Sequence, residues 1–399
     1  MFRLRGFGKY GLLLDAGVML TVWSAGVGAL WFLLPQIVSG FTGSVALIGC
    51  VMSIPPLVAL LVDVPVGGLV DRVGRRSVLL ASLFMLLLLA FLLVLVDGLV
   101  SLVFFLLLLG LFHQPVWISS VAYVMDLSPS GKSSEILGLE MGFLNLGFAV
   151  GPVLAGLAVA YLDSRVFAAS LIFSIACFTA FLLAMSLRED MAGRESVRQG
   201  FKDLVFKDKL FVKELSDYRR MGSTGVAILL FTFMFTFFDG VVWTFEPLYY
   251  SRFSDQVLLG GLLMSSFIVP LILFEAPAGL LADRFGRRRI LSLGLLAAGV
   301  FSVLFSQSSS IEHLILTGFL SASGIAFAWP SIEGLLAVKA GKGSRGEAVG
   351  VSTMAEDLGY VLGPVVGGLV SVYFGMSSVF LFMGLVLIAS VFTVFLVED

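Results

Sequence analysis

The chain contains the same motif twice, and each copy ends a long apolar run. Residues 63–76 read Asp-Val-Pro-Val-Gly-Gly-Leu-Val-Asp-Arg-Val-Gly-Arg-Arg, and residues 275–288 read Glu-Ala-Pro-Ala-Gly-Leu-Leu-Ala-Asp-Arg-Phe-Gly-Arg-Arg. The same offset (275 − 63 = 212) aligns Trp31 with Trp243 and Trp117 with Trp329. A register kept over this distance indicates a duplicated half. Repeats of this size within an apolar chain are typical of membrane proteins built from two related bundles.

The composition places the chain in a lipid bilayer. Of its 399 residues, 59% are hydrophobic and only 13% are charged. This leaves too little polar surface to cover a soluble globule. A membrane-spanning helix needs roughly 20 apolar residues, and divisions at charge clusters and turns predict twelve such runs. We therefore expect an all-α membrane protein of twelve transmembrane helices in two pseudo-symmetric six-helix bundles.

The distribution of basic residues predicts the orientation. With the amino terminus inside, only Arg165 and Arg252 of the 25 Lys and Arg residues lie on the outer side. Because basic loops stay cytoplasmic, we expect a multi-pass protein of the plasma membrane with both termini in the cytoplasm. The predicted domains are an N-terminal bundle at 1–187, a cytoplasmic linker at 188–221 and a C-terminal bundle at 222–399. Apolar residues recur at helical spacing in the linker, which favours an amphipathic helix over a flexible tether.

The repeated motif resembles the signature loop of the major facilitator superfamily, which lies between helices 2 and 3 and again between helices 8 and 9. The resemblance covers essentially the whole chain. It implies that the loop acts as a latch that stabilises the outward-facing state, with Asp126 as the acidic partner of Arg75. The predicted latch residues are Gly67, Asp71, Arg72, Gly74, Arg75, Arg76, Asp126, Gly279, Asp283, Arg284, Gly286 and Arg287. The alternative is that the basic residues only set the orientation.

A second pattern resembles the Gly-x-x-x-Gly-Pro-x-x-Gly-Gly sequence of antiporters in this superfamily. The copy in the fifth predicted helix departs from it at Ala155, whereas the copy in the eleventh matches in full. A further antiporter pattern expects arginine where Leu106 stands, which weakens the resemblance to drug and proton antiporters. Close helix packing alone also explains such glycines. The residues of the two copies are Gly147, Gly151, Pro152, Gly156, Gly359, Gly363, Pro364, Gly367 and Gly368.

Ionisable side chains inside the predicted spans are candidates for binding a coupling proton, because a charge in the bilayer is costly. Several of the acids have an apolar residue at the matching position of the other half; Asp239, for example, matches Val27. No Lys or Arg lies inside a predicted span, so these acids have no cationic partner there. In a dry environment their ionised forms are therefore disfavoured. Asp357 and His113 are expected near the middle of the membrane. The candidates are Asp239, Asp357, Glu246, Glu356, Glu333 and His113. The alternative for each is a structural hydrogen bond.

The substrate is expected to be a lipophilic or cationic small molecule. Without cations inside the spans the chain is poorly suited to an obligate anion, whereas acids and aromatic rings suit a cation. The expected cavity residues are Asn145, Gln114, Trp243, Phe238, Trp31 and Trp329. Most aromatic side chains in such helices pack or face lipid, so these positions are also compatible with a purely structural role.

The sequence therefore predicts a monomeric secondary transporter of the drug and proton antiporter type, working by alternating access. Its expected partners are a small-molecule substrate, protons and the lipid bilayer, and not nucleic acid. Uptake of a neutral solute such as a sugar is the first alternative, and a scaffold or receptor without transport is the second. Gly6-x-Gly8-x-x-Gly11 matches a dinucleotide fingerprint but follows no strand. With two histidines and no zinc spacing, we expect no enzyme activity, cofactor or metal.

Overall fold

The computed structural model describes residues 8–127, 133–187, 222–339 and 345–396. Within these ranges every regular element is a helix, and twelve helices are long and apolar enough to cross a membrane. The predicted fold class is confirmed. The predicted linker at 188–221 lies outside the described residues.

The first half of the chain holds seven α-helices and one short 3-10 helix. Their bounds are α1 Gly8–Phe41, α2 Val45–Met52, α3 Ile54–Val73, α4 Arg75–Leu92, η1 Leu93–Leu95, α5 Leu99–Leu127, α6 Ser133–Leu162 and α7 Arg165–Ser186. The second half holds α10 Gly222–Tyr249, η2 Tyr250–Arg252, α11 Val257–Phe285, α12 Arg287–Ser306, α13 Ile311–Lys339, α14 Arg345–Phe374, α15 Ser377–Ser390 and η3 Val391–Leu396.

The repeated motif forms a helix end rather than an open loop. Its first part continues α3 through Arg72 to Val73, and α4 begins only two residues later. The break is a single glycine, Gly74, with φ at 102°; its counterpart Gly286 has φ at 96°. Residues with a Cβ atom rarely adopt this backbone conformation. Glycine therefore lets two long helices turn sharply and meet at one membrane face.

The second membrane span, Val45–Asp63, is interrupted by a short break. Helix α2 ends at Met52 and α3 begins at Ile54, directly before Pro55 and Pro56. Proline lacks the amide hydrogen that a continuous helix needs. Two adjacent prolines remove two such donors in a row, whereas the single Pro65 is accommodated within α3. The two prolines thus fix the start of α3.

The chain divides into two compact units, whose boundary cuts through the first two spans. Unit 1 holds the described residues within 1–33 and 61–208, and unit 2 those within 34–60 and 209–399. The end of α1, all of α2 and the start of α3 therefore belong to unit 2.

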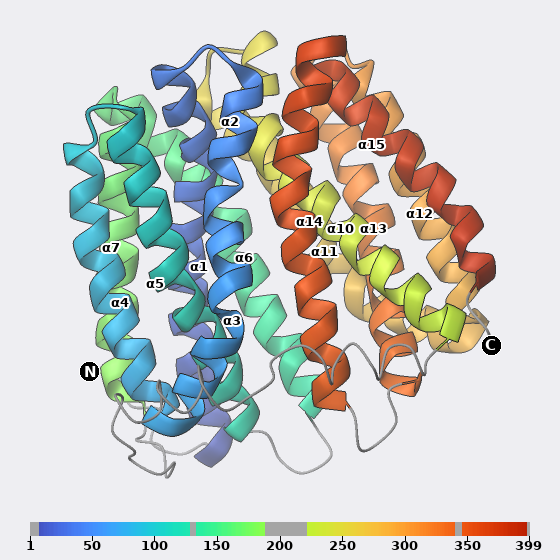
Figure 1. Ribbon diagram of the computed structural model, residues 1–399, viewed down its shortest axis with the longest axis horizontal. Helices are drawn as coiled ribbons and strands as arrows, with labels where there is room; N and C mark the ends of the chain where they lie inside the picture. The colour runs from blue at the N-terminus through green and yellow to red at the C-terminus, as the bar shows by residue number, and fades with distance from the viewer. Residues whose placement is uncertain (1–7, 128–132, 188–221, 340–344, 397–399) are drawn as a thin grey trace. The chain divides into compact units, whose positions relative to one another are not determined.

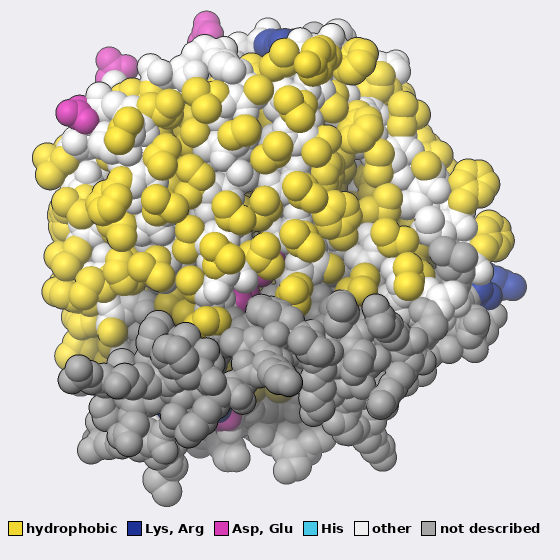
Figure 2. All heavy atoms as spheres, viewed as in Figure 1, with side chains coloured by type: hydrophobic (Ala, Val, Ile, Leu, Met, Phe, Trp, Pro, Cys, Tyr) yellow, Lys and Arg dark blue, Asp and Glu magenta, His cyan; other side chains and the backbone are white. Residues whose placement is uncertain are grey.

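Within unit 1, α4 packs against both α5 and α7 (Figure 1). In unit 2, α12 lies between α13 and α15, while α10 packs along α14. The outward sides of these helices carry apolar side chains, which appear yellow in Figure 2. Leu61 and Leu95 in the first half and Leu280 in the second are at least 68% exposed. Such exposure is expected where lipid takes the place of water.

Candidate functional site

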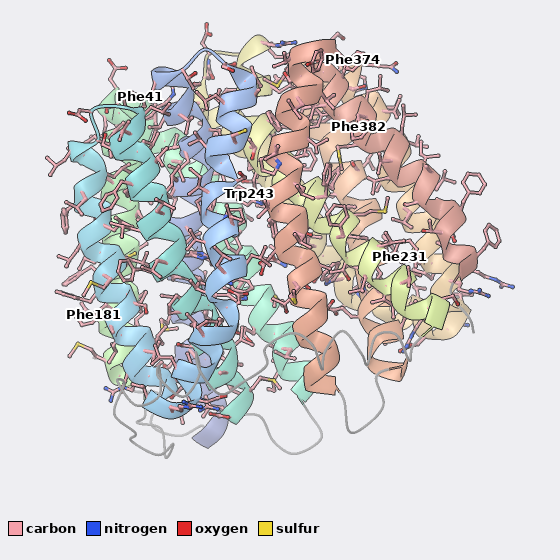
Figure 3. All side chains as sticks on the ribbon, viewed as in Figure 1. Phe41, Phe181, Phe231, Trp243, Phe374 and Phe382 are labelled. Atoms are coloured by element: carbon pink, nitrogen blue, oxygen red, sulfur yellow. The ribbon has the colours of Figure 1, made fainter. Side chains whose placement is uncertain are left out.

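Helices α10 and α14 of unit 2 bring a tyrosine and three carboxyl groups together. The hydroxyl of Tyr360 donates a hydrogen bond to Oδ2 of Asp239 at 2.9 Å. Asp239, Glu356 and Asp357 all lie close enough to Tyr360 to interact with its hydroxyl electrostatically. Trp243, which Figure 3 labels one turn along α10, also hydrogen bonds to Asp239. We call Asp239, Tyr360, Glu356 and Asp357 the acid cluster.

The acid cluster is at least partly buried, and its members are three acids and a tyrosine. Asp357 is 8% exposed, and the other members are partly buried. The described spans carry Lys and Arg only at or near their ends. Three negative charges at such a place repel one another and lose hydration. Binding a proton or a cationic solute is the change that relieves this repulsion.

Glu246 lies two turns beyond Asp239 on the same helix and is more deeply enclosed. Its side chain is 0% exposed, and neither carboxyl oxygen has a hydrogen-bond partner among the described residues. One turn further, the hydroxyl of Tyr250 donates to Oε1 of Gln36 at 3.3 Å. A buried carboxylate without a partner is strongly disfavoured, so Glu246 is suited to holding a proton.

Glu333 and Trp329 lie together on α13. The indole nitrogen of Trp329 donates to Oε1 of Glu333 at 3.0 Å, and its ring lies 5.2 Å from that of Phe235 on α10. The side chain of Glu333 is exposed. Glu275 on α11 lies near enough to repel it electrostatically. Phe238 instead packs toward α11, with its ring 6.4 Å from Phe267. The predicted residues of this half therefore form several groups.

The candidates in unit 1 form a separate aromatic group. His113 stacks beside Trp23 with ring centroids 5.1 Å apart, and Trp117 lies 6.4 Å from the same indole. His113 also hydrogen bonds to Gln114. Among the described residues no hydrogen bond or ring contact joins the partly buried Asn145 and Trp31 to His113 or to each other. The structure therefore groups only some of the cavity residues predicted here.

The first copy of the repeated motif forms ion pairs within unit 1. Nη2 of Arg75 lies 3.2 Å from Oδ1 of Asp71, and Nε lies 2.7 Å from Oδ2 of Asp126 at the end of α5. The second approach has the distance of an ion pair but not the alignment of a hydrogen bond. Asp71 is 69% and Asp126 53% exposed, so water screens both pairs. Such contacts fit a reversible latch; that role stays a prediction.

The second copy forms a different contact. Arg287 pairs with Asp283, with Nη2 at 3.0 Å from Oδ1, and its Nη1 donates to the main-chain oxygen of Gly334 on α13. Val338 stands where the first half has Asp126. The backbone oxygen of Gly334 thus takes the place of a carboxylate.

The glycines of α6 and α14 are points of close helix contact. A Cβ at Gly147 or Gly151 would clash with the backbone of α1, and one at Gly359 or Gly363 would clash with the backbone of α10. A Cβ at Gly367 would meet the ring of Phe245. These contacts place α14 so near α10 that Tyr360 reaches Asp239.

Two polar residues of interest were missed by the sequence analysis. Tyr360 matches Phe148 at the offset of 212, and Glu140 matches Ser352. Glu140 is 2% exposed, and neither of its carboxyl oxygens has a hydrogen-bond partner among the described residues. Comparing the two halves at every polar position, as was done for Asp239, would have found both.

No group of three or more His, Cys, Asp or Glu side chains in the described ranges is arranged to hold a metal ion. The family model described as Major Facilitator Superfamily matches residues 16–254 and 228–399 of the chain.

Two bacterial relatives match along most of their length. The MFS-type transporter YuxJ of Bacillus subtilis (strain 168) is 26% identical over 336 residues, covering 83% of each chain. Multidrug resistance protein MdtG of Escherichia coli O9:H4 (strain HS) is 26% identical over 365 residues, covering 89% of this chain and 86% of the relative. Among solved structures, the nucleoside transporter NupG is similar with a TM-score of 0.78 at 15% identity, covering 97% of this chain and 100% of NupG. At that identity the likeness shows the fold alone.

Proposed function

The chain belongs to the major facilitator superfamily, and on that premise we propose that it expels lipophilic or cationic small molecules in exchange for protons. It is a multi-pass membrane transporter and not an enzyme. Alternating access is the proposed mode of transport, in a plasma membrane with both termini in the cytoplasm. We propose the monomer as the working unit.

The observation that supports proton coupling is the contact between Tyr360 and Asp239. When Asp239 is ionised, the Tyr360 hydroxyl stabilises it through the 2.9 Å hydrogen bond. When a proton or a cation arrives, the negative charge is removed or compensated, and the repulsion from Glu356 and Asp357 falls. A carboxyl group that switches in this way near the middle of a membrane can couple solute binding to a proton gradient.

The substrate class is proposed from the chemistry of the same region. The acids supply negative charge, and Trp243 beside Asp239 supplies a ring face that attracts cations and stacks on apolar groups. An anionic solute lacks a basic partner inside the described spans. The relative named multidrug resistance protein MdtG supports efflux over uptake.

Transport in purified liposomes tests the proposal directly. The liposomes contain a pH-sensitive dye, and tetraphenylphosphonium serves as the lipophilic cation. We expect the wild-type protein to move protons when the cation is added. Asp239→Asn keeps the size of the side chain but cannot exchange a proton, so we expect it to abolish this signal; Asp357→Asn is expected to do the same.

Two further variants make the result specific. Tyr360→Phe removes only the hydroxyl, so we expect weakened rather than abolished coupling, whereas Asp255→Asn changes an exposed acid between α10 and α11 and should have no effect. Normal coupling in both Asp239→Asn and Asp357→Asn would show that other acids carry the proton. If neutral sugars and not cations raised the thermal unfolding midpoint of the protein, the uptake alternative would be favoured. If no solute were transported, a scaffold would be favoured.

A further inference from the structure

A hollow lies at one edge of unit 2, between the start of α12 and η3. Its volume is about 420 Å³, and it is lined by Arg288, Arg289, Ser292, Leu293, Val394 and Phe395. Both elements are ends of membrane spans, since one span begins at Arg287 and another ends at Phe395. The hollow therefore lies where helices leave the bilayer.

The lining has a basic side and an apolar side. Arg289 is exposed, and Nη2 of Arg288 donates to the main-chain oxygen of Phe395 at 3.4 Å, which joins the two walls. Leu293 is 63% exposed and Phe395 80% exposed. Figure 2 shows dark blue basic side chains beside yellow apolar ones at the corresponding edge, near the chain end marked C in Figure 1.

Comparison with the first half separates what the fold requires from what has been added. Arg76 matches Arg288, and its Nη2 donates to the carbonyl oxygen of Met185 at the end of α7, at 2.7 Å. An arginine that holds the last helix of each half is thus common to both repeats. The other five lining residues differ: Arg289, Ser292, Leu293, Val394 and Phe395 stand where the first half has Ser77, Leu80, Ala81, Leu182 and Leu183. The second cation, Arg289, and the aromatic ring of Phe395 therefore exist only in the second half.

We propose that this hollow binds an anionic phospholipid. The phosphate lies against Arg289, whose planar guanidinium matches phosphate oxygens, and an acyl chain lies along Leu293 and Phe395. Free phosphate would occupy only the basic side and leave the apolar wall uncovered. A basic pocket beside transmembrane helices is the arrangement that recognises anionic headgroups.

Native mass spectrometry of the full-length protein tests the proposal by counting bound lipids. The probes are phosphatidylglycerol, phosphatidylcholine with matched acyl chains, and glycerol 3-phosphate. We expect phosphatidylglycerol to bind more tightly than phosphatidylcholine, because only its headgroup carries a net negative charge. Glycerol 3-phosphate should bind weakly because it lacks the chains. Equal binding of the two lipids, or tight binding of glycerol 3-phosphate, would overturn the proposal.

Single substitutions locate the site. Arg289→Gln is expected to weaken binding of phosphatidylglycerol about fivefold, from the typical contribution of one basic residue near a lipid headgroup. Arg252→Gln is the matched control, because it removes an exposed arginine at the end of a different span. Leu293→Ala should weaken binding of both lipids. Equal losses in Arg289→Gln and Arg252→Gln would show a general charge effect and no site in the hollow. Each outcome is independent of proton coupling.

Discussion

Arg75 and Arg287 occupy matching positions in the two repeats and pair with matching aspartates, but their second partners differ. Arg75 meets the carboxylate of Asp126, while Arg287 meets the main-chain oxygen of Gly334. The matching residue of Gly334 in the first half is Ala122. A Cβ at Gly334 would lie 2.7 Å from the Cζ atom of Arg287, so the absence of a side chain is what admits the guanidinium.

Gly334→Ala is therefore expected to destabilise the protein by about 1–3 kcal/mol, the usual cost of adding a methyl group to a filled site. The midpoint of thermal unfolding in detergent measures this. The control is Gly279→Ala in the second copy of the repeated motif. A Cβ there would lie 3.7 Å from Pro330, which is an ordinary van der Waals contact. Alanine also favours the helix at an open position, so the control should be neutral or slightly stabilising. Equal shifts in both variants would contradict the assignment.

The sequence indicated candidate residues but not their contacts. Asp239, Glu356 and Asp357 were identified because charge inside a span is costly, and this argument needs no coordinates. Their grouping around Tyr360 depends on how α14 is rotated against α10, which one sequence does not give. Glu140 and Tyr360 were missed because the two halves were compared at only some of the polar positions.

At the scale of the elements, the glycine patterns of α6 and α14 act first as packing surfaces. Gly147 and Gly151 approach the backbone of α1, and Gly359 and Gly363 approach that of α10. Small residues allow such approach, which gives van der Waals contact in a membrane. The same contact pattern in both halves explains why the pattern is duplicated.

Gly147→Val tests this packing in unit 1. We expect a loss of about 2 kcal/mol in the free energy of unfolding, because the new methyl groups would meet Ser24 and the backbone of α1. Gly142→Val on the same helix is the control, since a Cβ there has no neighbour within 4 Å. Unfolding in mixed micelles with increasing SDS gives both values. A stable Gly147→Val protein that nevertheless fails to couple protons would favour a direct antiport role.

The run lengths of apolar residues predicted the number of spans, because every crossing needs a similar length. They did not predict the ends. The break at Ser53 depends on Pro55 and Pro56, and the motif glycines end helices only because they adopt positive φ. These are local backbone properties that a hydropathy count averages away.

For the whole molecule, the position of α2 is the least expected feature. By sequence α2 belongs to the first repeat, yet it packs against α14 and is part of unit 2. Gly49 faces the backbone of Pro364, and a Cβ at Gly368 would lie 3.0 Å from Cα of Ala46. The closest approach is at Gly49, where a Cβ would clash with the oxygen of Pro364, whereas at Gly368 a small shift would accommodate one. If transport proceeds by alternating access, α2 must leave α14 during each cycle.

A disulfide between Ala46→Cys and Gly368→Cys would prevent that separation, because α2 and α14 are in direct contact at these positions. Cys50 and Cys177 are first replaced by serine and alanine, so that no other thiol remains. We expect transport of tetraphenylphosphonium to stop on oxidation and to return on reduction, while each single-cysteine variant stays active throughout. The thermal midpoint should rise in the oxidised form, because the bond constrains the unfolded chain. Full transport by the oxidised, cross-linked protein would show that α2 and α14 remain together through the cycle, and the motion between the two repeats would then have to occur elsewhere.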